Sequence, residues 1–166
     1  MLSTYSPKDV TVSIAGLHTV SGYANDTFIK VSKDMKPFTV VRAMNGEMSR
    51  LYSDDTGYKV ELTLMQSSST NNILSMLYNI DTATRIGKFP LFIKDGLGQS
   101  SFMAGTAWIE QIPDLAFGNE LQTRTWVFGC SDAVINFGGN EETSVIEDTL
   151  LVASSTLPLL RQFGVF

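Results

Sequence analysis

The sequence predicts a mainly β protein, between all-β and α+β, built as an antiparallel β-barrel or sandwich with one flanking helix and a helical C-terminal extension. Three observations lead to this class. Segments that alternate apolar and polar residues recur along residues 10–137, as in half-buried strands. Turn-forming residues separate these segments, as between antiparallel neighbours. Helical spacing occurs only in residues 73–80 and after residue 144, so we divide the chain into a β domain, 1–140, and an extension, 141–166.

The N-terminal third consists of short strand patterns. Val10, Val12 and Ile14 alternate with polar or small residues, and Leu17 to Val20 could return as a hairpin after Gly16. Two further extended runs follow, Phe28 to Lys33 and Phe38 to Arg42, with Pro37 between them.

The segment from Met44 to Gly57 is polar and punctuated by glycine. Asn45-Gly46 is a strong hairpin-turn signal, and Asp54-Asp55-Thr56-Gly57 closes the far end. We therefore predict a long, protruding hairpin or loop over these residues.

A strand and a helix follow directly. From Tyr58 to Gln66 the residues alternate, so that Tyr58, Val60, Leu62 and Leu64 share one face and Lys59, Glu61, Thr63 and Met65 the other. Side-chain oxygens between Ser67 and Asn72 can cap a helix. The apolar stripe of that helix comprises Ile73, Leu77 and Ile80, widened by Leu74 and Tyr78. The helix should therefore lie against a sheet.

The second half adds four strand patterns and the extension. The strands are predicted at Phe89 to Lys94, Ser101 to Ile112, Gln122 to Cys130 and Ala133 to Phe137. In the extension, Ser144 and Glu147 form a capping-box pattern, and Ile146, Leu150, Ala153, Leu157 and Leu160 recur at helical spacing. Pro158 should end or kink this helix near Leu157.

Composition limits the possible functions. Of 166 residues, 43% are apolar and only 17% charged, against roughly 25% charged in ordinary globular chains, so we expect a large core, a large interface or both. A net charge of -5 argues against tight nucleic-acid binding. The N-terminus has no signal-peptide pattern, and no apolar run reaches the roughly 18 residues of a membrane span, so we expect a soluble chain without a membrane partner.

The residue types of common catalytic and metal sites are scarce. His18 is the single histidine, and we interpret it as a surface or half-buried strand residue; Cys130 is interpreted as a small core residue. The sequence therefore predicts no catalytic residue, no metal site and no cofactor. An enzyme reading would need folding to join carboxylates among Asp34, Glu61, Glu110 and Glu120.

Taken in order, several stretches resemble the tail tube proteins of contractile-tailed (myovirus-type) bacteriophages. They are TYSPKDVTVSIAG, MNGEMSRLYSDDTGYKVELTLMQSSSTNNILSML, FPLFIKDGLGQSSFMAGTAWIEQIPDLAFGNE and RTWVFGCSDAVINFGGN, and the resemblance covers residues 6–140. None is a catalytic signature; their order and spacing carry the likeness. The segment after Asn140 departs from the pattern, because similar chains tend to end near that point.

The resemblance implies a β-barrel or sandwich subunit of a virion tail, made in the host bacterial cytoplasm. Such subunits form hexameric rings that stack into a hollow tube for DNA ejection. The implied partners are further copies of the chain and the sheath, baseplate and tail terminator proteins. The tape-measure protein and DNA would pass through the lumen without sequence-specific binding.

Three candidate contact regions follow from this interpretation. The inter-ring contact loop comprises Met44, Asn45, Gly46, Glu47, Arg50, Asp54 and Asp55. The lumen-wall strand comprises Tyr58, Lys59, Val60, Glu61, Leu62, Thr63 and Leu64. The intersubunit tail comprises Ile146, Leu150, Leu157, Leu160 and Phe163.

Two alternatives to a tail tube remain open at the level of sequence. One is another tail or baseplate component, such as a hub or terminator. The other is a stand-alone β-sandwich module that binds a carbohydrate or a protein. Polymerisation separates the module from the rest, because a module stays a small soluble species at all concentrations.

Overall fold

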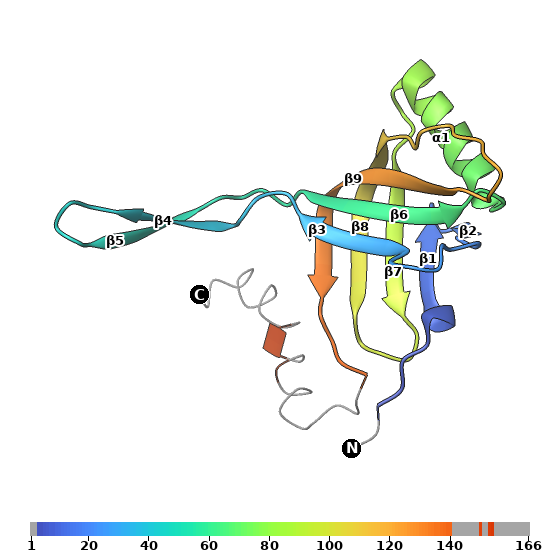
Figure 1. The fold of residues 1–166 in the computed structure, drawn as a ribbon. Coiled ribbons are helices and arrows are strands. Elements are labelled where there is room, and N and C mark those ends of the chain that lie inside the picture. Colours follow the sequence, from blue (N-terminus) through green and yellow to red (C-terminus); the bar gives the residue numbers. More distant parts are fainter. Residues whose placement is uncertain (1–2, 141–149, 151–152, 155–166) are drawn as a thin grey trace.

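The computed structural model describes residues 3–140, 150, 153 and 154. The elements in chain order are η1 (Pro7–Asp9), β1 (Val10–Ile14), β2 (His18–Thr19), β3 (Ile29–Lys33), β4 (Phe38–Arg42), β5 (Met48–Tyr52), β6 (Tyr58–Met65), α1 (Thr70–Thr84), β7 (Phe89–Asp95), β8 (Ser101–Gln111) and β9 (Thr123–Asn136). The predicted class, mainly β with antiparallel strands and one helix beside them, is confirmed (Figure 1). The predicted extension, 141–166, lies outside the described residues except for Leu150, Ala153 and Ser154.

The larger sheet has seven strands in the order β2-β1-β7-β8-β9-β6-β3, and every neighbouring pair is antiparallel. The sheet folds into two layers at β9, because the first half of β9 pairs with β6 while most of its length also pairs with β8 (Figure 1). One layer therefore holds β1, β7 and β8, and β6 and β3 cross it in the other. The edges of this sandwich are β2 and β3.

The two strands predicted at Gln122 to Cys130 and Ala133 to Phe137 are one strand, so that prediction was wrong. Ser131-Asp132 suggested a turn, and Asp132 does have a positive φ of 51°. The ladder with β8 nevertheless continues on both sides, through Thr106↔Ser131 and Ala104↔Ala133. A single residue of unusual backbone conformation, lying opposite Gly105, does not end the strand.

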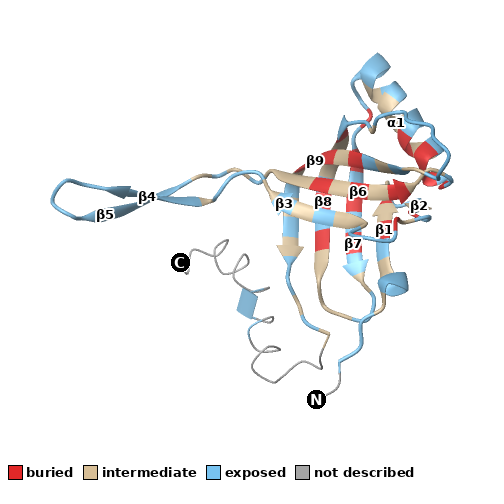
Figure 2. Cartoon of the chain, in the orientation of Figure 1, coloured by how far each residue is buried: buried red, intermediate tan, exposed pale blue. Residues whose placement is uncertain are grey.

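The core lies between the layers (Figure 2). Val60, Leu62 and Leu64 of β6 are fully buried, as the predicted alternation requires, and they pack with Val12, Ile14, Leu91, Phe128 and other apolar side chains. The opposite face of β6 is half-exposed. Cys130 is 2% exposed and belongs to the core, which confirms its interpretation.

Helix α1 covers the end of the sandwich beyond β6, and it is longer than the stripe predicted. Ser68 Oγ accepts the backbone N–H of Thr70 at 3.3 Å, so the predicted capping chemistry is present at one residue. Leu74 is fully buried, whereas Ile80 is 47% exposed. The prediction therefore overstated the burial of Ile80. The buried face is centred on Leu74 and extends to Leu77 and Tyr78.

Candidate assembly surfaces

A two-stranded arm projects from the sandwich, formed by β4 and β5 (Figure 1). The strands pair from Phe38↔Tyr52 to Arg42↔Met48, and the loop between them holds Met44, Asn45 and Gly46. The sequence prediction placed the start of the protruding segment at Met44. In the structure the preceding run, Phe38–Arg42, is the first strand of the arm, so the arm is longer and less polar than predicted.

Every residue of β4 and β5 is exposed. The exposed residues include large apolar side chains on both faces of the ribbon, namely Phe38, Val40, Val41, Met48, Leu51 and Tyr52. An isolated two-stranded hairpin has marginal stability in water at best, and contiguous exposed apolar residues mark interaction surfaces. The arm is therefore a candidate interaction surface.

One face of the arm carries most of its local contacts. The rings of Phe38 and Tyr52 lie 5.3 Å apart, and the guanidinium carbon of Arg50 lies 4.2 Å from the Phe38 ring centre. The predicted contact residue Arg50 is thus held over an aromatic side chain near the base of the arm. The other apolar residues of the arm were missed by the sequence prediction; the available signal was two five-residue runs placed symmetrically about Asn45.

The base of the arm is fixed by Asp55. Its side chain accepts the N–H of Gly57 at 2.8 Å, and its backbone carbonyl accepts Lys33 Nζ at 3.0 Å. Ser53 N–H donates to the Pro37 carbonyl at 2.7 Å, which joins the two chains where they enter the arm. Asp54, the other predicted carboxylate, accepts the Tyr52 hydroxyl at 3.3 Å. These contacts set the direction in which the arm projects.

The predicted lumen-wall strand is β6, between β3 and β9. Its core-facing residues are buried, and Lys59, Glu61 and Thr63 lie on the opposite, polar face. On this face Thr63 and Thr125 share a hydrogen bond of 3.1 Å between their hydroxyl groups. We call the surface formed by Lys30, Lys59, Glu61, Thr63 and Thr125 the polar sheet face; their cross-strand register places them together.

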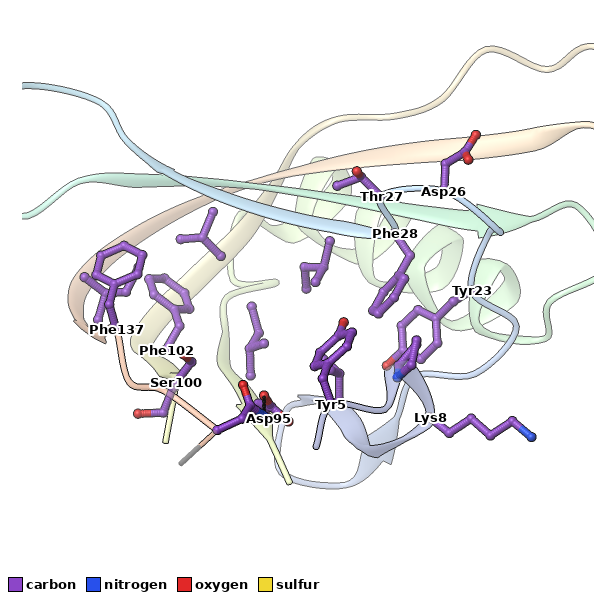
Figure 3. A pocket seen from close by; sticks show the side chains of 18 of the residues that line it. Tyr5, Lys8, Tyr23, Asp26, Thr27, Phe28, Asp95, Ser100, Phe102 and Phe137 are labelled. Carbon is purple, nitrogen blue, oxygen red and sulfur yellow. Dashed lines mark hydrogen bonds between the residues drawn. The ribbon is translucent and has the colours of Figure 1, made fainter. Parts of the chain in front are cut away.

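An apolar groove of about 1120 Å³ opens between β3 and the ends of the strands in the other layer (Figure 3). Its lining includes Tyr5, Tyr23, Phe28, Phe102 and Phe137. The rings of Tyr23 and Phe28 lie 4.7 Å apart, and burial raises the pKa of Tyr23. Asn140 lies on the rim and donates to Asp95 Oδ2 at 3.0 Å. The lining also includes the charged residues Lys8, Asp26 and Asp95.

His18 and Cys130, the two side chains considered above for catalysis, are held by a hydrogen bond and by burial. His18 is half-exposed and its Nε2 lies 3.0 Å from Thr70 Oγ1. Burial, with a smaller effect of the Asp34 charge, raises the pKa of Cys130 to about 12, so its thiol stays protonated at neutral pH. Within the described part of the chain, no cluster of three or more His, Cys, Asp or Glu residues could hold a metal ion. No helix of that part is long and apolar enough to cross a membrane.

The four carboxylates of the enzyme alternative lie on different elements. Asp34 follows β3, Glu61 is in the middle of β6, Glu110 is near the end of β8, and Glu120 is in the β8–β9 connection.

The chain is a β-sandwich with one flanking helix and an exposed two-stranded arm. Comparisons with known proteins show which proteins it resembles. No model of a known protein family matches the chain. It is 31% identical over 156 residues to structural protein ORF10 of Pseudomonas phage KPP10, a match that covers 89% of this chain and 90% of that protein. The chain therefore belongs to the family of phage structural proteins that includes ORF10.

Two solved structures are similar to the chain. The anti-feeding prophage cap, described as the tube terminating cap, superposes with a TM-score of 0.51 at 14% identity, over 82% of this chain and 93% of that chain. The sheath/tube terminator of an extracellular contractile injection system, in the extended state, gives a TM-score of 0.47 at 11% identity, over 81% and 97% of the two chains. The first likeness shows a shared fold.

Proposed function

We propose that the chain is a non-enzymatic subunit of a contractile phage tail, which forms hexameric rings that stack into the hollow tube for genome delivery. The observation that carries this proposal is the arm formed by β4 and β5. It is exposed along its whole length, it is apolar on both faces, and its base is fixed by hydrogen bonds. Such an arm gains its stability when it packs between other subunits.

The polar sheet face is our candidate for the wall of the lumen. Lys59, Glu61 and Thr63 offer polar side chains on this half-exposed face, with Val127 of β9 opposite Glu61. The net charge of -5 of the whole chain argues against tight binding of DNA to the rings, and the polar sheet face itself carries two lysines, Lys30 and Lys59, and one acid, Glu61. The tape-measure protein would pass the same wall, and the sheath would contact the outside of the rings.

A second candidate function is that of a terminator or other tail component, which closes or caps a tube rather than forming its length. The fold shared with the tube terminating cap of the anti-feeding prophage favours this alternative. A tube subunit adds further rings to itself, whereas a terminator stops at one ring. The stand-alone binding module has no comparable support.

Electron microscopy of the purified full-length protein over a concentration series tests the proposal. We expect hollow tubes or stacked rings with a regular axial repeat. Single rings that do not stack would favour the terminator alternative. Monomers at every concentration would contradict both.

The role of the arm is tested by deleting residues 45–54. We expect a folded subunit that fails to elongate, and a normal circular dichroism spectrum as the control for folding. Tubes of normal length from this variant would remove the arm from the assembly contact.

A further inference from the structure

The tip of the arm has a defined shape. Ala43 and Glu47 pair across the loop, with the Ala43 N–H 2.8 Å from the Glu47 carbonyl. Gly46 has a positive φ of 88°, and Asn45 Oδ1 accepts the Glu47 N–H at 3.1 Å. A loop of this kind is a rigid three-residue hairpin connection. It holds the Met44 side chain fully exposed at the end of the arm.

The charges beside Met44 form a pair of opposite sign. Arg42 ends β4 and Glu47 precedes β5, and both are exposed. The tip therefore presents an apolar, unbranched side chain, with an exposed cation two positions before it and an exposed anion three positions after it in the chain.

A hollow of about 280 Å³ lies between α1 and the β8–β9 connection. It is lined by Ser75, Tyr78, Asn79, Ile112, Pro113, Asp114, Leu115, Arg124 and Trp126. This volume is smaller than the roughly 300–1,000 Å³ of typical small-molecule sites. It suits one side chain better than a ligand, and Met adapts well to irregular apolar gaps.

The hollow carries the complementary charges. Asp114 and Arg124, one anion and one cation, both line it together with the aromatic side chains of Trp126 and Tyr78. Leu115, which lines the hollow, is 73% exposed, and Phe117, two positions further along the connection, is 74% exposed. These exposed apolar residues on the β8–β9 connection match the exposed apolar residues of the arm, since each surface needs to be covered.

The arm and the hollow lie on opposite sides of the sandwich, because the arm projects away from α1 (Figure 1). A contact between them must therefore join two copies, with the tip of the first in the hollow of the second. The hollow of the first copy and the tip of the second then stay free for further copies. Such a heterologous contact either closes into a ring or repeats as an open stack. Under the proposed function we assign it to the contact between stacked rings.

We infer that the arm of one copy docks in the hollow of a copy in the next ring, with Met44 inserted between α1 and the β8–β9 connection, Arg42 paired with Asp114, and Glu47 paired with Arg124. This inference rests on the proposed function, to which it adds the receiving surface. It gives the stack a direction, because one side of each ring offers tips and the other offers hollows.

Charge exchange in the full-length protein tests the pairing. Arg42→Glu and Asp114→Arg should each raise the concentration needed for assembly by about tenfold or more, equal to roughly 1.4 kcal/mol or more, because each leaves like charges at the contact. The double variant R42E/D114R should restore assembly toward the wild-type concentration. The matched control is Lys88→Glu, a change of the same type at an exposed position outside both surfaces, which should assemble as the wild type does.

A disulfide test supplies an independent readout. In a Cys130→Ser background, Met44→Cys combined with Leu115→Cys should give oxidised covalent chains of more than two subunits. Each single-cysteine variant can give dimers at most. Absence of such chains in the double-cysteine protein would overturn the inference.

The remaining outcomes separate this inference from the proposed function. If deletion of residues 45–54 abolishes stacking but the charge variants assemble normally, the arm docks elsewhere, so the hollow is wrong and the function stands. If each single exchange impairs stacking and the double variant does not recover, Arg42 and Asp114 do not face each other and the inference fails. If the deletion variant stacks normally, the inference and the proposed role of the arm both fail.

Discussion

Trp126 donates its indole N–H to the side-chain oxygen of Asn71 at 2.9 Å, and this bond joins β9 to the first turn of α1. Both residues are almost fully buried, at 4% and 3% exposure. The amide nitrogen of Asn71 donates to the carbonyls of Met65 and Ser68 at 3.0 and 3.1 Å. One amide group thus fixes a tryptophan, the end of β6 and the start of the helix.

Asn71→Leu is expected to destabilise the protein by about 1–3 kcal/mol, because it leaves the buried Trp126 N–H without an acceptor. The Met65 and Ser68 carbonyls keep their backbone donors, the N–H groups of residues 68 and 71. Urea unfolding followed by tryptophan fluorescence measures this change. Asn72→Leu, next along the helix at an exposed position, is the control and should change the free energy of unfolding by less than about 0.5 kcal/mol. Equal effects at the two positions would contradict the structural role of Asn71.

Truncation of the helix face gives a second test. Leu74→Ala should cost about 2–5 kcal/mol, since Leu74 is fully buried and its removal leaves a cavity. Ile80→Ala should cost less than about 1 kcal/mol, because Ile80 is 47% exposed. Urea midpoints of the two variants compare them directly, and a larger loss at Ile80 would favour the stripe expected from the sequence.

The sequence predicted the class, most strands and the alternation of β6 because a half-buried strand needs an apolar residue at every second position. The prediction was wrong where contacts between distant parts of the chain determine the structure. The strand β9 passes through Ser131-Asp132 because β8 pairs with both sides of it, and no local pattern reports that pairing. Ile80 fits the helical spacing, but the sheet ends before reaching it.

The candidate contact regions were predicted unevenly for a related reason. Asn45-Gly46 signals the tip of the arm locally, so Met44 and Glu47 were found. The hollow joins residues from α1, β9 and the β8–β9 connection, which are up to 51 positions apart, from Ser75 to Trp126. The periodicity of the sequence does not report contacts between residues so far apart in the chain.

The arm should exchange its backbone hydrogens fast in the dispersed subunit. A two-stranded ribbon with every residue exposed opens locally at low free-energy cost. In assembled tubes the amides of Thr39, Val41 and Ser49 should become protected, whereas those of β6 stay protected in both states. Hydrogen–deuterium exchange with mass spectrometry measures both, and an arm that exchanges equally fast in both states would contradict burial on assembly.

Cys130 should be inert in the folded protein. Its pKa, raised to about 12 by burial, keeps the thiol protonated, so a thiol reagent at pH 8 should react only after unfolding in urea. The same shift has a consequence for stability. The unfolded thiol ionises near its ordinary pKa of 9.0 while the folded thiol does not, so the contribution of Cys130 is present below pH 9 and is lost as the pH rises toward 12.

The pH effect is isolated by comparing the wild type with Cys130→Ala between pH 8 and pH 11. The wild type should lose more stability over this range than the variant, which has no ionisable group at that position. Parallel pH profiles of the two proteins, or fast labelling of the native protein at pH 8, would contradict the buried, protonated thiol.

Removal of residues 141–166 tests the candidate intersubunit tail. The truncated chain ends at Asn140, on the rim of the apolar groove, and it keeps every strand and helix named here. It should therefore fold with a thermal midpoint close to that of the full chain. Assembly should weaken, because the apolar residues Ile146, Leu157, Leu160 and Phe163 are proposed to contact a neighbouring subunit. The matched full-length variant L157D/L160D should assemble as poorly as the truncated chain in sedimentation and electron microscopy. A truncated chain that forms normal tubes would show that the tail takes no part in the contact between subunits.

A lowered thermal midpoint of the truncated chain would instead indicate that the tail packs on its own domain.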